Sequence, residues 1–110
     1  MKIEIVRNET YTVARLAGQF NTEASDDAAH TLLEEFQNTA TMILDFDQVP
    51  YLSSSGMRVI LRLAKTAITG EKGFVICGMN QDVTAAMKLT GFLTDIHVAK
   101  DLKTAEMLYV

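Results

Sequence analysis

Apolar and polar positions follow two different periods along the chain, and these periods predict where strands and helices lie. Residues 2–5 alternate with period two, and 11–16 form a second run of strand type. We therefore expect an opening β-hairpin that ends at Gly18. The continuous apolar runs at 42–44 and 74–77 are typical of strands covered on both faces in a partly parallel sheet.

Helical periods separate these strands. Over residues 22–36 an apolar residue recurs at every fourth position, which predicts an amphipathic helix with Asn21 or Thr22 as its N-cap. Residues 56–69 predict a second helix, with arginine, lysine and threonine on its polar face. The apolar face of this second helix is expected to consist of Met57, Ile60, Leu61, Ala64 and Ile68.

The last third of the chain predicts three shorter elements. Asn80 caps a helix that runs through Met87 and stops near Gly91, residues 96–98 form a short strand, and Asp101 caps a final helix through residue 108. The predicted order is ββαβαβαβα. We expect an α/β fold in a single domain over residues 1–110, with helices packed on a mixed sheet and right-handed crossovers between parallel strands.

Composition supports one folded domain and limits its partners. The chain has 110 residues, of which 48% are hydrophobic and 22% charged, enough for one core and unlike a disordered segment. A formal net charge of −4 argues against nucleic acid or an anionic membrane as the main partner. The single Cys77 lies in an apolar run and is expected to be a buried, inert thiol, which favours a reducing compartment. With no membrane span or signal peptide recognisable, we expect a cytoplasmic protein.

Most catalytic and cofactor chemistry is absent from the sequence. His30 and His97 stand without metal-ligand spacing, and no glycine-rich phosphate loop is present. Asp45 and Asp47 could form an acid/base pair, yet their position fits a strand exit and turn equally well. A serine nucleophile would need a base, and nothing in the pattern brings either histidine to a serine. We expect no metal, no cofactor and no enzymatic activity.

The stretch VPYLSSSGMR at 49–58 places three serines between a strand and a helix, and it has two interpretations. A serine hydroxyl can cap the helix, which stabilises it by about 1 kcal/mol. A serine there can also be a phosphorylation switch, since the positive end of the helix dipole favours added negative charge. Arg58 follows Ser55 by three residues, and no acidic residue lies between 48 and 70.

The segment MILDFDQVPYLSSSGMRVILRL resembles the characteristic motif of STAS domains, which are named for sulphate transporters and anti-sigma factor antagonists. That motif is an apolar strand, Asp, a short turn with Val, and then Asp-Ser-Ser-Gly-Leu at the start of a helix. AGQFN and KLTGFLTDIHVAKDLKTAEML extend the resemblance over essentially the whole chain. The residues that fall into the register of the motif are Asp45, Val49, Ser54, Ser55, Gly56 and Leu61.

This resemblance implies an anti-sigma factor antagonist without catalytic activity. Such a domain binds an anti-sigma factor that is also an ATP-dependent serine kinase, and so releases the sigma factor. The resemblance places the phosphoacceptor at Ser55, with phosphorylation ending the binding and a PP2C-type phosphatase reversing it. The expected partner surface is the loop and the first two helical turns, with Val59 off the apolar stripe: Ser53, Ser54, Ser55, Gly56, Met57, Arg58, Val59 and Arg62. For Met57 the residue type favours a core position over the surface, and both arginines suit an ordinary solvated face equally well.

One departure from the motif leaves alternatives open. Ser53 stands where the motif has Asp, so either Asp47 compensates or the partner differs, and Ser53 and Ser54 become rival phosphoacceptors. Two other functions are compatible with the resemblance. The chain could be an accessory subunit of a lipid-transport ATPase or a larger signalling assembly, or it could bind a nucleotide or another small ligand.

Overall fold

The computed structural model describes residues 1–91 and 96–109, and it confirms the predicted order of elements. The part of the predicted closing motif at 92–95, and residue 110 of the predicted domain, lie outside the described residues. The elements are β1 (Lys2–Arg7), β2 (Thr12–Ala17), α1 (Thr22–Gln37), β3 (Thr41–Gln48), α2 (Ser54–Gly70), β4 (Gly73–Cys77), α3 (Gln81–Leu89), β5 (His97–Ala99) and α4 (Leu102–Tyr109).

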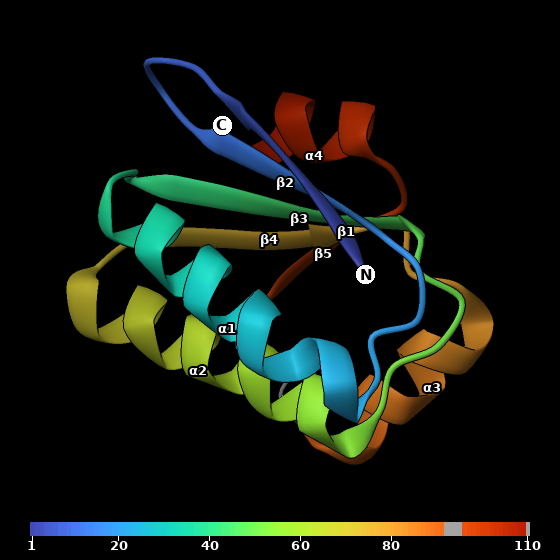
Figure 1. The fold of residues 1–110 in the computed structure, drawn as a ribbon. Coiled ribbons are helices and arrows are strands. Elements are labelled where there is room, and N and C mark those ends of the chain that lie inside the picture. The colour runs from blue at the N-terminus through green and yellow to red at the C-terminus, as the bar shows by residue number, and fades with distance from the viewer. Residues whose placement is uncertain (92–95, 110) are drawn as a thin grey trace.

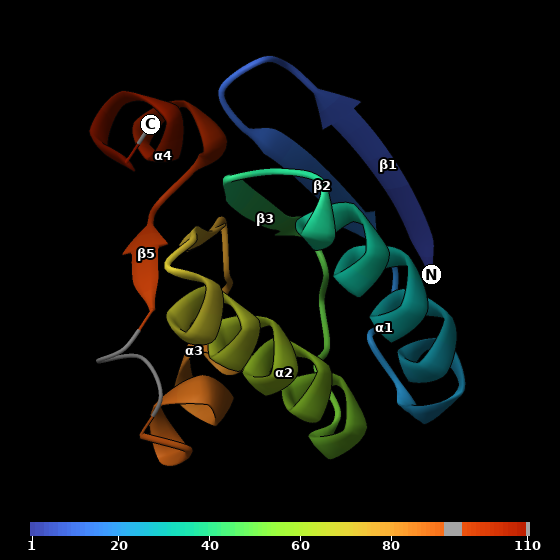
Figure 2. The same cartoon turned by 90° about the vertical axis from the view of Figure 1, so that its left-hand side faces the viewer.

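The sheet is mixed, as expected. Its five strands follow the order β1-β2-β3-β4-β5; β1 and β2 are antiparallel, and the later neighbours are parallel. Helices α1, α2 and α3 lie on one side of the sheet, and α4 lies on the other (Figures 1 and 2). No helix within the described ranges is long and apolar enough to cross a membrane.

The continuous apolar strands are buried because helices cover both faces of the sheet. On β3, Met42, Leu44 and Phe46 belong to the larger core under α1 and α2, whereas Ile43 belongs to the smaller core under α4. Adjacent residues of a strand point to opposite faces, so one apolar run serves two cores. Cys77 lies in the second core and is fully buried, which confirms its predicted position.

Side-chain caps begin the helices where the sequence predicts them. Asn21, and not Thr22, caps α1: its Oδ1 accepts a hydrogen bond from the Ala24 amide at 3.0 Å. Asn80 caps α3 through the Val83 amide at 2.8 Å, and Asp101 accepts from the Thr104 amide at 2.8 Å at the start of α4. Each cap satisfies an amide that has no partner within its own helix.

The predicted apolar face of α2 is partly wrong. The helix begins at Ser54, earlier than predicted; Met57 and Leu61 are only half-buried, and Ile68 is 65% exposed. The buried residues recur at intervals of three and four, as the predicted ones do, but the packed face is rotated by about one residue relative to the predicted face. The buried residues are Gly56, Val59, Ile60, Leu63, Ala64 and Ala67.

The turns that follow β2 and β3 are locked together beyond the ends of the strands. The Phe20 amide donates to the Tyr51 carbonyl at 2.9 Å, and the Ser53 amide donates to the Phe20 carbonyl at 2.9 Å. Phe20 and Leu52 form an isolated parallel bridge, and both are buried. These bonds hold the N-termini of α1 and α2 side by side.

Gly56 is required at this junction because a side chain has no room there. A Cβ atom on Gly56 would lie 2.8 Å from a ring carbon of Phe20 and 2.9 Å from its carbonyl oxygen. We expect Gly56→Ala to destabilise the protein by about 1–3 kcal/mol through overpacking. Gly70→Ala is the matched control, since its nearest contact is a flexible Lys72 carbon at 3.4 Å. Urea unfolding should show this control to be neutral or slightly stabilising; equal stability of the two variants would contradict the tight junction.

Candidate functional site

Ser53 is the residue that caps α2. It has extended backbone angles, and its Oγ accepts a hydrogen bond from the Gly56 amide at 3.0 Å. Its side chain is buried, and its own amide is bound to the Phe20 carbonyl. The structure therefore gives the capping role to Ser53 and removes its hydroxyl from the surface on which we expected it.

Ser55 lies at the surface without a capping role. It is half-buried in the first turn of α2, and its hydroxyl donates to the Thr22 hydroxyl at 3.4 Å, at the start of α1. Ser54 is exposed beside it. Capping and phosphorylation thus need not compete for one serine. Neither Ser54 nor Ser55 takes part in the bond from Ser53 to the Gly56 amide.

The environment of Ser55 favours negative charge. The first turn of α2 contains no acidic residue, and its free amides carry the positive end of the helix dipole. Arg58 and Arg62 are exposed on the following turns, as predicted for a solvated basic face.

The remaining predicted surface residues divide between surface and core. Met57 is half-buried and packs against the main core, and Gly56 is buried against Phe20. The predicted exposure of Val59 is wrong, since it is 4% exposed. Val59 lies on the buried stripe of α2 together with Leu63 and Ala67. The surface available to a partner therefore centres on Ser54, Ser55, Arg58 and Arg62.

Thr22 is the site residue that sequence reasoning missed, because we considered it only as a possible cap. The signal was available in the pattern. Residues 11–16 and 42–44 were both predicted as strands, and neighbouring parallel strands end at the same edge of a sheet. The segments that follow them, AGQFN and PYLSSS, are accordingly brought together at the Phe20–Leu52 bridge.

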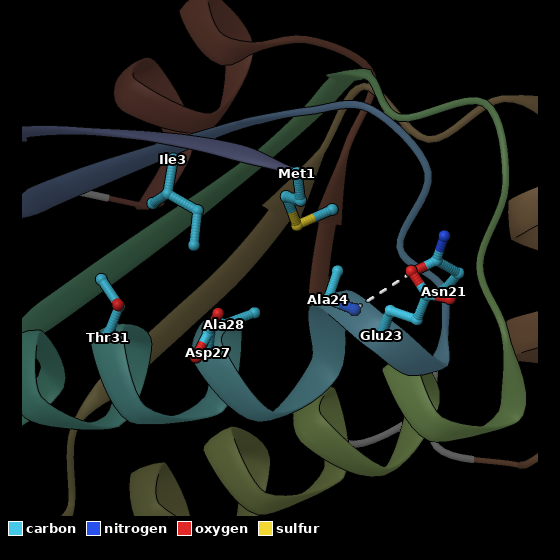
Figure 3. Close-up of a pocket in the computed structure, with 8 residues that line it drawn as sticks. All are labelled: Met1, Ile3, Asn21, Glu23, Ala24, Asp27, Ala28 and Thr31. Atoms are coloured by element: carbon cyan, nitrogen blue, oxygen red, sulfur yellow. Dashed lines mark hydrogen bonds between the residues drawn. The ribbon is translucent and has the colours of Figure 1, made fainter.

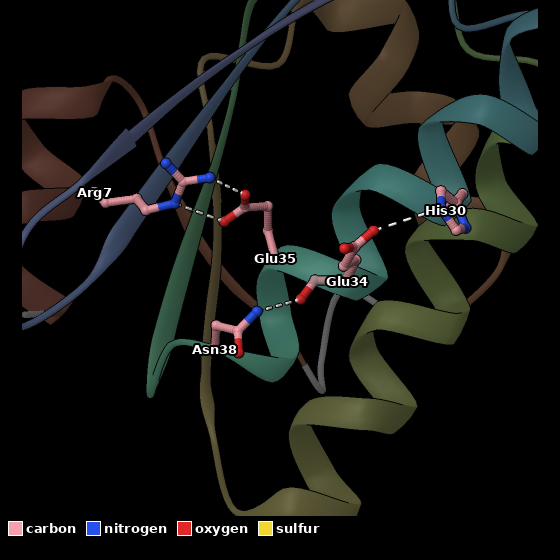
Figure 4. A network of polar contacts seen from close by, with 5 residues as sticks. All are labelled: Arg7, His30, Glu34, Glu35 and Asn38. Atoms are coloured by element: carbon pink, nitrogen blue, oxygen red, sulfur yellow. Dashed lines mark hydrogen bonds and ion pairs between the residues drawn. The ribbon is translucent and has the colours of Figure 1, made fainter.

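His30 and His97 make their contacts away from the three serines. His30 pairs with Glu34 on the exposed surface of α1 (Figure 4), and the ring of His97 stacks on that of Tyr109 with centroids 4.7 Å apart. Within the described ranges, no hydrogen bond or ion pair joins either histidine to Ser53, Ser54 or Ser55.

Asp45 and Asp47 form a strand exit. Asp45 Oδ1 accepts from the Asp47 amide at 3.0 Å, and its Oδ2 lies 3.4 Å from Arg15 Nε. Burial raises the pKa of the neighbouring Cys77 thiol to about 12, with a further contribution from the Asp45 charge. The thiolate is the reactive form, so Cys77 is unreactive near neutral pH. Asp47 contacts Asp45 and Gln48. That its charge compensates for the aspartate that the motif has at position 53 stays a prediction.

A pocket of about 450 Å³ lies between β1 and α1, next to the N-cap of α1 (Figure 3). Met1 and Ile3 line one wall, and Glu23 and Asp27 contribute carboxylates to the other. The amide oxygen of Asn21 in this pocket is already bound to the Ala24 amide. Two carboxylates repel phosphate, so this pocket is poorly suited to a nucleotide.

Comparison with known proteins gives a consistent picture. The sequence model of the STAS domain matches residues 2–105. BtrV of Bordetella bronchiseptica, whose name assigns it provisionally as an anti-sigma factor antagonist, is 26% identical over 106 residues, covering 96% of this chain and 91% of BtrV.

Two solved structures have the same fold. A Thermotoga maritima protein, also provisionally assigned as an anti-sigma factor antagonist, superimposes with a TM-score of 0.89 at 16% identity, covering 96% of this chain and 92% of that one. The phosphorylated form of the Bacillus cell fate determinant SpoIIAA superimposes with a TM-score of 0.76 at 14% identity, covering 97% of this chain and 99% of SpoIIAA.

The different roles of the serines predict different stabilities. We expect Ser53→Ala to lower the free energy of unfolding by about 1 kcal/mol, because it removes the cap from the Gly56 amide. Ser55→Ala should change it by at most about 0.5 kcal/mol, since its hydroxyl makes one long contact at the surface. Urea unfolding of both variants checks this. A larger loss for Ser55→Ala than for Ser53→Ala would show that the cap has been assigned to the wrong residue.

Proposed function

The chain belongs to the STAS domain family, and from this premise we propose that it is an anti-sigma factor antagonist. In this proposal it is a non-catalytic cytoplasmic module that binds an anti-sigma factor with serine kinase activity and thereby releases the sigma factor. Phosphorylation of Ser55 ends the binding, and a PP2C-type phosphatase restores it. The names of BtrV and of the Thermotoga maritima protein support this class of function.

The observation that carries the proposal is the division of labour between Ser53 and Ser55. A useful phosphoacceptor must be accessible to a kinase, and its modification must leave the fold intact. Ser55 is half-exposed at a helix N-terminus, while Ser53 provides the bond to the Gly56 amide. A phosphate on Ser55 would therefore add charge at a favourable end of α2 without removing its cap.

A phosphate at this position is sufficient to disrupt an interface. It adds roughly −1.5 to −2 charges where the unmodified surface presents a neutral hydroxyl, and a partner would have to desolvate them. No refolding of the domain is needed for such a switch. SpoIIAA, which shares this fold, has been solved in both unphosphorylated and phosphorylated forms.

The test is phosphorylation by the anti-sigma factor kinases of the source organism. We expect incubation with ATP to add one phosphate to the wild-type chain, measured by intact mass, and Ser55→Ala to abolish it. Ser54→Ala is the matched control and should still be phosphorylated. Ser55→Ala should still bind the kinase, since it leaves the interface neutral, and Ser55→Asp should bind at least about tenfold more weakly.

Thermal melts of each variant separate lost contacts from lost stability. The proposal for Ser55 fails if Ser55→Asp binds as tightly as the wild type, or if the phosphate is found on Ser54. If the unphosphorylated wild-type chain binds no anti-sigma factor, the proposed antagonist function itself is wrong.

A further inference from the structure

The outer surfaces of α1 and α2 carry opposite charges. The exposed carboxylates of α1, Glu23, Asp26, Asp27 and Glu34, form an acidic ridge, and this helix contains no lysine or arginine. The exposed cations of α2, Arg58, Arg62 and Lys65, form a basic ridge, and this helix contains no acidic residue. The two helices lie side by side on the same face of the sheet (Figure 2).

The two ridges do not neutralise each other. Among the described ion pairs, Glu34 binds His30 on its own helix, and none includes Arg58, Arg62 or Lys65. Figure 4 shows the His30–Glu34 pair on the side of α1 towards α2, whereas Glu35 turns to Arg7 on the hairpin. The charges on this face are therefore available to another molecule.

A groove of about 610 Å³ runs between the ridges. Asp26, His30, Glu34 and half-buried Leu33 line it from α1, and Arg62 is the residue that lines it from α2. The carboxylates of Asp26 and Glu34 thus lie across the groove from the guanidinium of Arg62. Such an arrangement favours a partner whose charges follow the reverse order and disfavours one in the wrong orientation, because like charges brought together in an interface repel each other.

We propose that the face formed by the acidic and basic ridges is a docking surface for a partner with the reversed charge pattern. An acidic segment of the partner lies over Arg58, Arg62 and Lys65, and a basic segment lies over Asp26 and Glu34. The inference rests on the proposed function, since the partner is the anti-sigma factor. The proposed contact surface extends from the loop that contains Ser53, Ser54 and Ser55 to α1. The sequence did not indicate a contribution from α1.

This orientation explains how a phosphate on Ser55 would act. Ser55 precedes the basic ridge by one helical turn and contacts Thr22 at the start of α1, so it lies at one end of the boundary between the ridges. The acidic segment of the partner would then face the phosphate. Repulsion between like charges would add to the desolvation cost and weaken the complex.

The test compares two single charge reversals with their combination, which alone leaves the net charge unchanged. The anti-sigma factor kinase that binds the wild-type chain is titrated with Asp26→Lys, with Arg62→Glu, and with the variant that combines both. We expect each single reversal to weaken binding about tenfold, and the combined variant to bind more weakly than either. The differences should shrink as ionic strength rises. Glu9→Lys in the hairpin turn and Lys103→Glu on α4 are the matched controls, both exposed, and should bind like the wild type.

Three results would overturn the charge-split surface while leaving the antagonist function intact. Recovery of wild-type affinity in the combined variant would show that only net charge matters. Equal binding by all variants would place the interface elsewhere. Dimerisation of the wild-type chain that the combined variant abolishes would assign the face to a second copy. A wild-type chain that binds no anti-sigma factor overturns the proposed function and this inference with it.

Discussion

The contact of Phe20 with Leu52 and Gly56 is the constraint on which the arrangement of α1, α2 and the loop with the three serines depends. Two backbone hydrogen bonds, from Phe20 to Tyr51 and from Ser53 to Phe20, continue the pairing of β2 and β3 into the turns that follow. Because those turns lead directly into α1 and α2, the two helices start at the same level and run alongside each other. The contact between Thr22 and Ser55, the groove, and the opposed charges on its walls all follow from this alignment.

Local periodicity was enough to predict the elements and their order, because each strand and helix of this chain is consistent with its own sequence. Asn21, Asn80 and Asp101 mark helix starts through interactions that span only three residues, and such interactions are visible in a sequence. The packed face of α2 was harder to predict. Apolar residues occur around most of this helix, so several stripes of its surface have the spacing of a packed face, and tertiary packing buries the one that contains Val59 and leaves Ile68 exposed.

At the candidate site, the sequence indicated the loop but not which of its three serines caps the helix. Each of the three is a good N-cap by residue type, and the choice is settled by a tertiary bond that fixes the Ser53 amide to a residue over thirty positions away. The role of α1 escaped prediction for a related reason. In the sequence its carboxylates have the pattern of an ordinary solvated surface, and only the fold places Asp26 and Glu34 across a groove from Arg62, which enters no ion pair among the described residues.

The separation of the cap from the phosphoacceptor that we propose has an evolutionary consequence. When one residue serves both folding and regulation, a substitution there is exposed to selection on stability as well as on signalling. In the switch that we propose, a change at Ser55 leaves the bond between Ser53 and Gly56 in place, so regulation can be lost, regained or transferred to a neighbouring hydroxyl while the fold is inherited unchanged. Duplicated copies of such a domain could therefore diverge into switchable and permanently active forms through single substitutions.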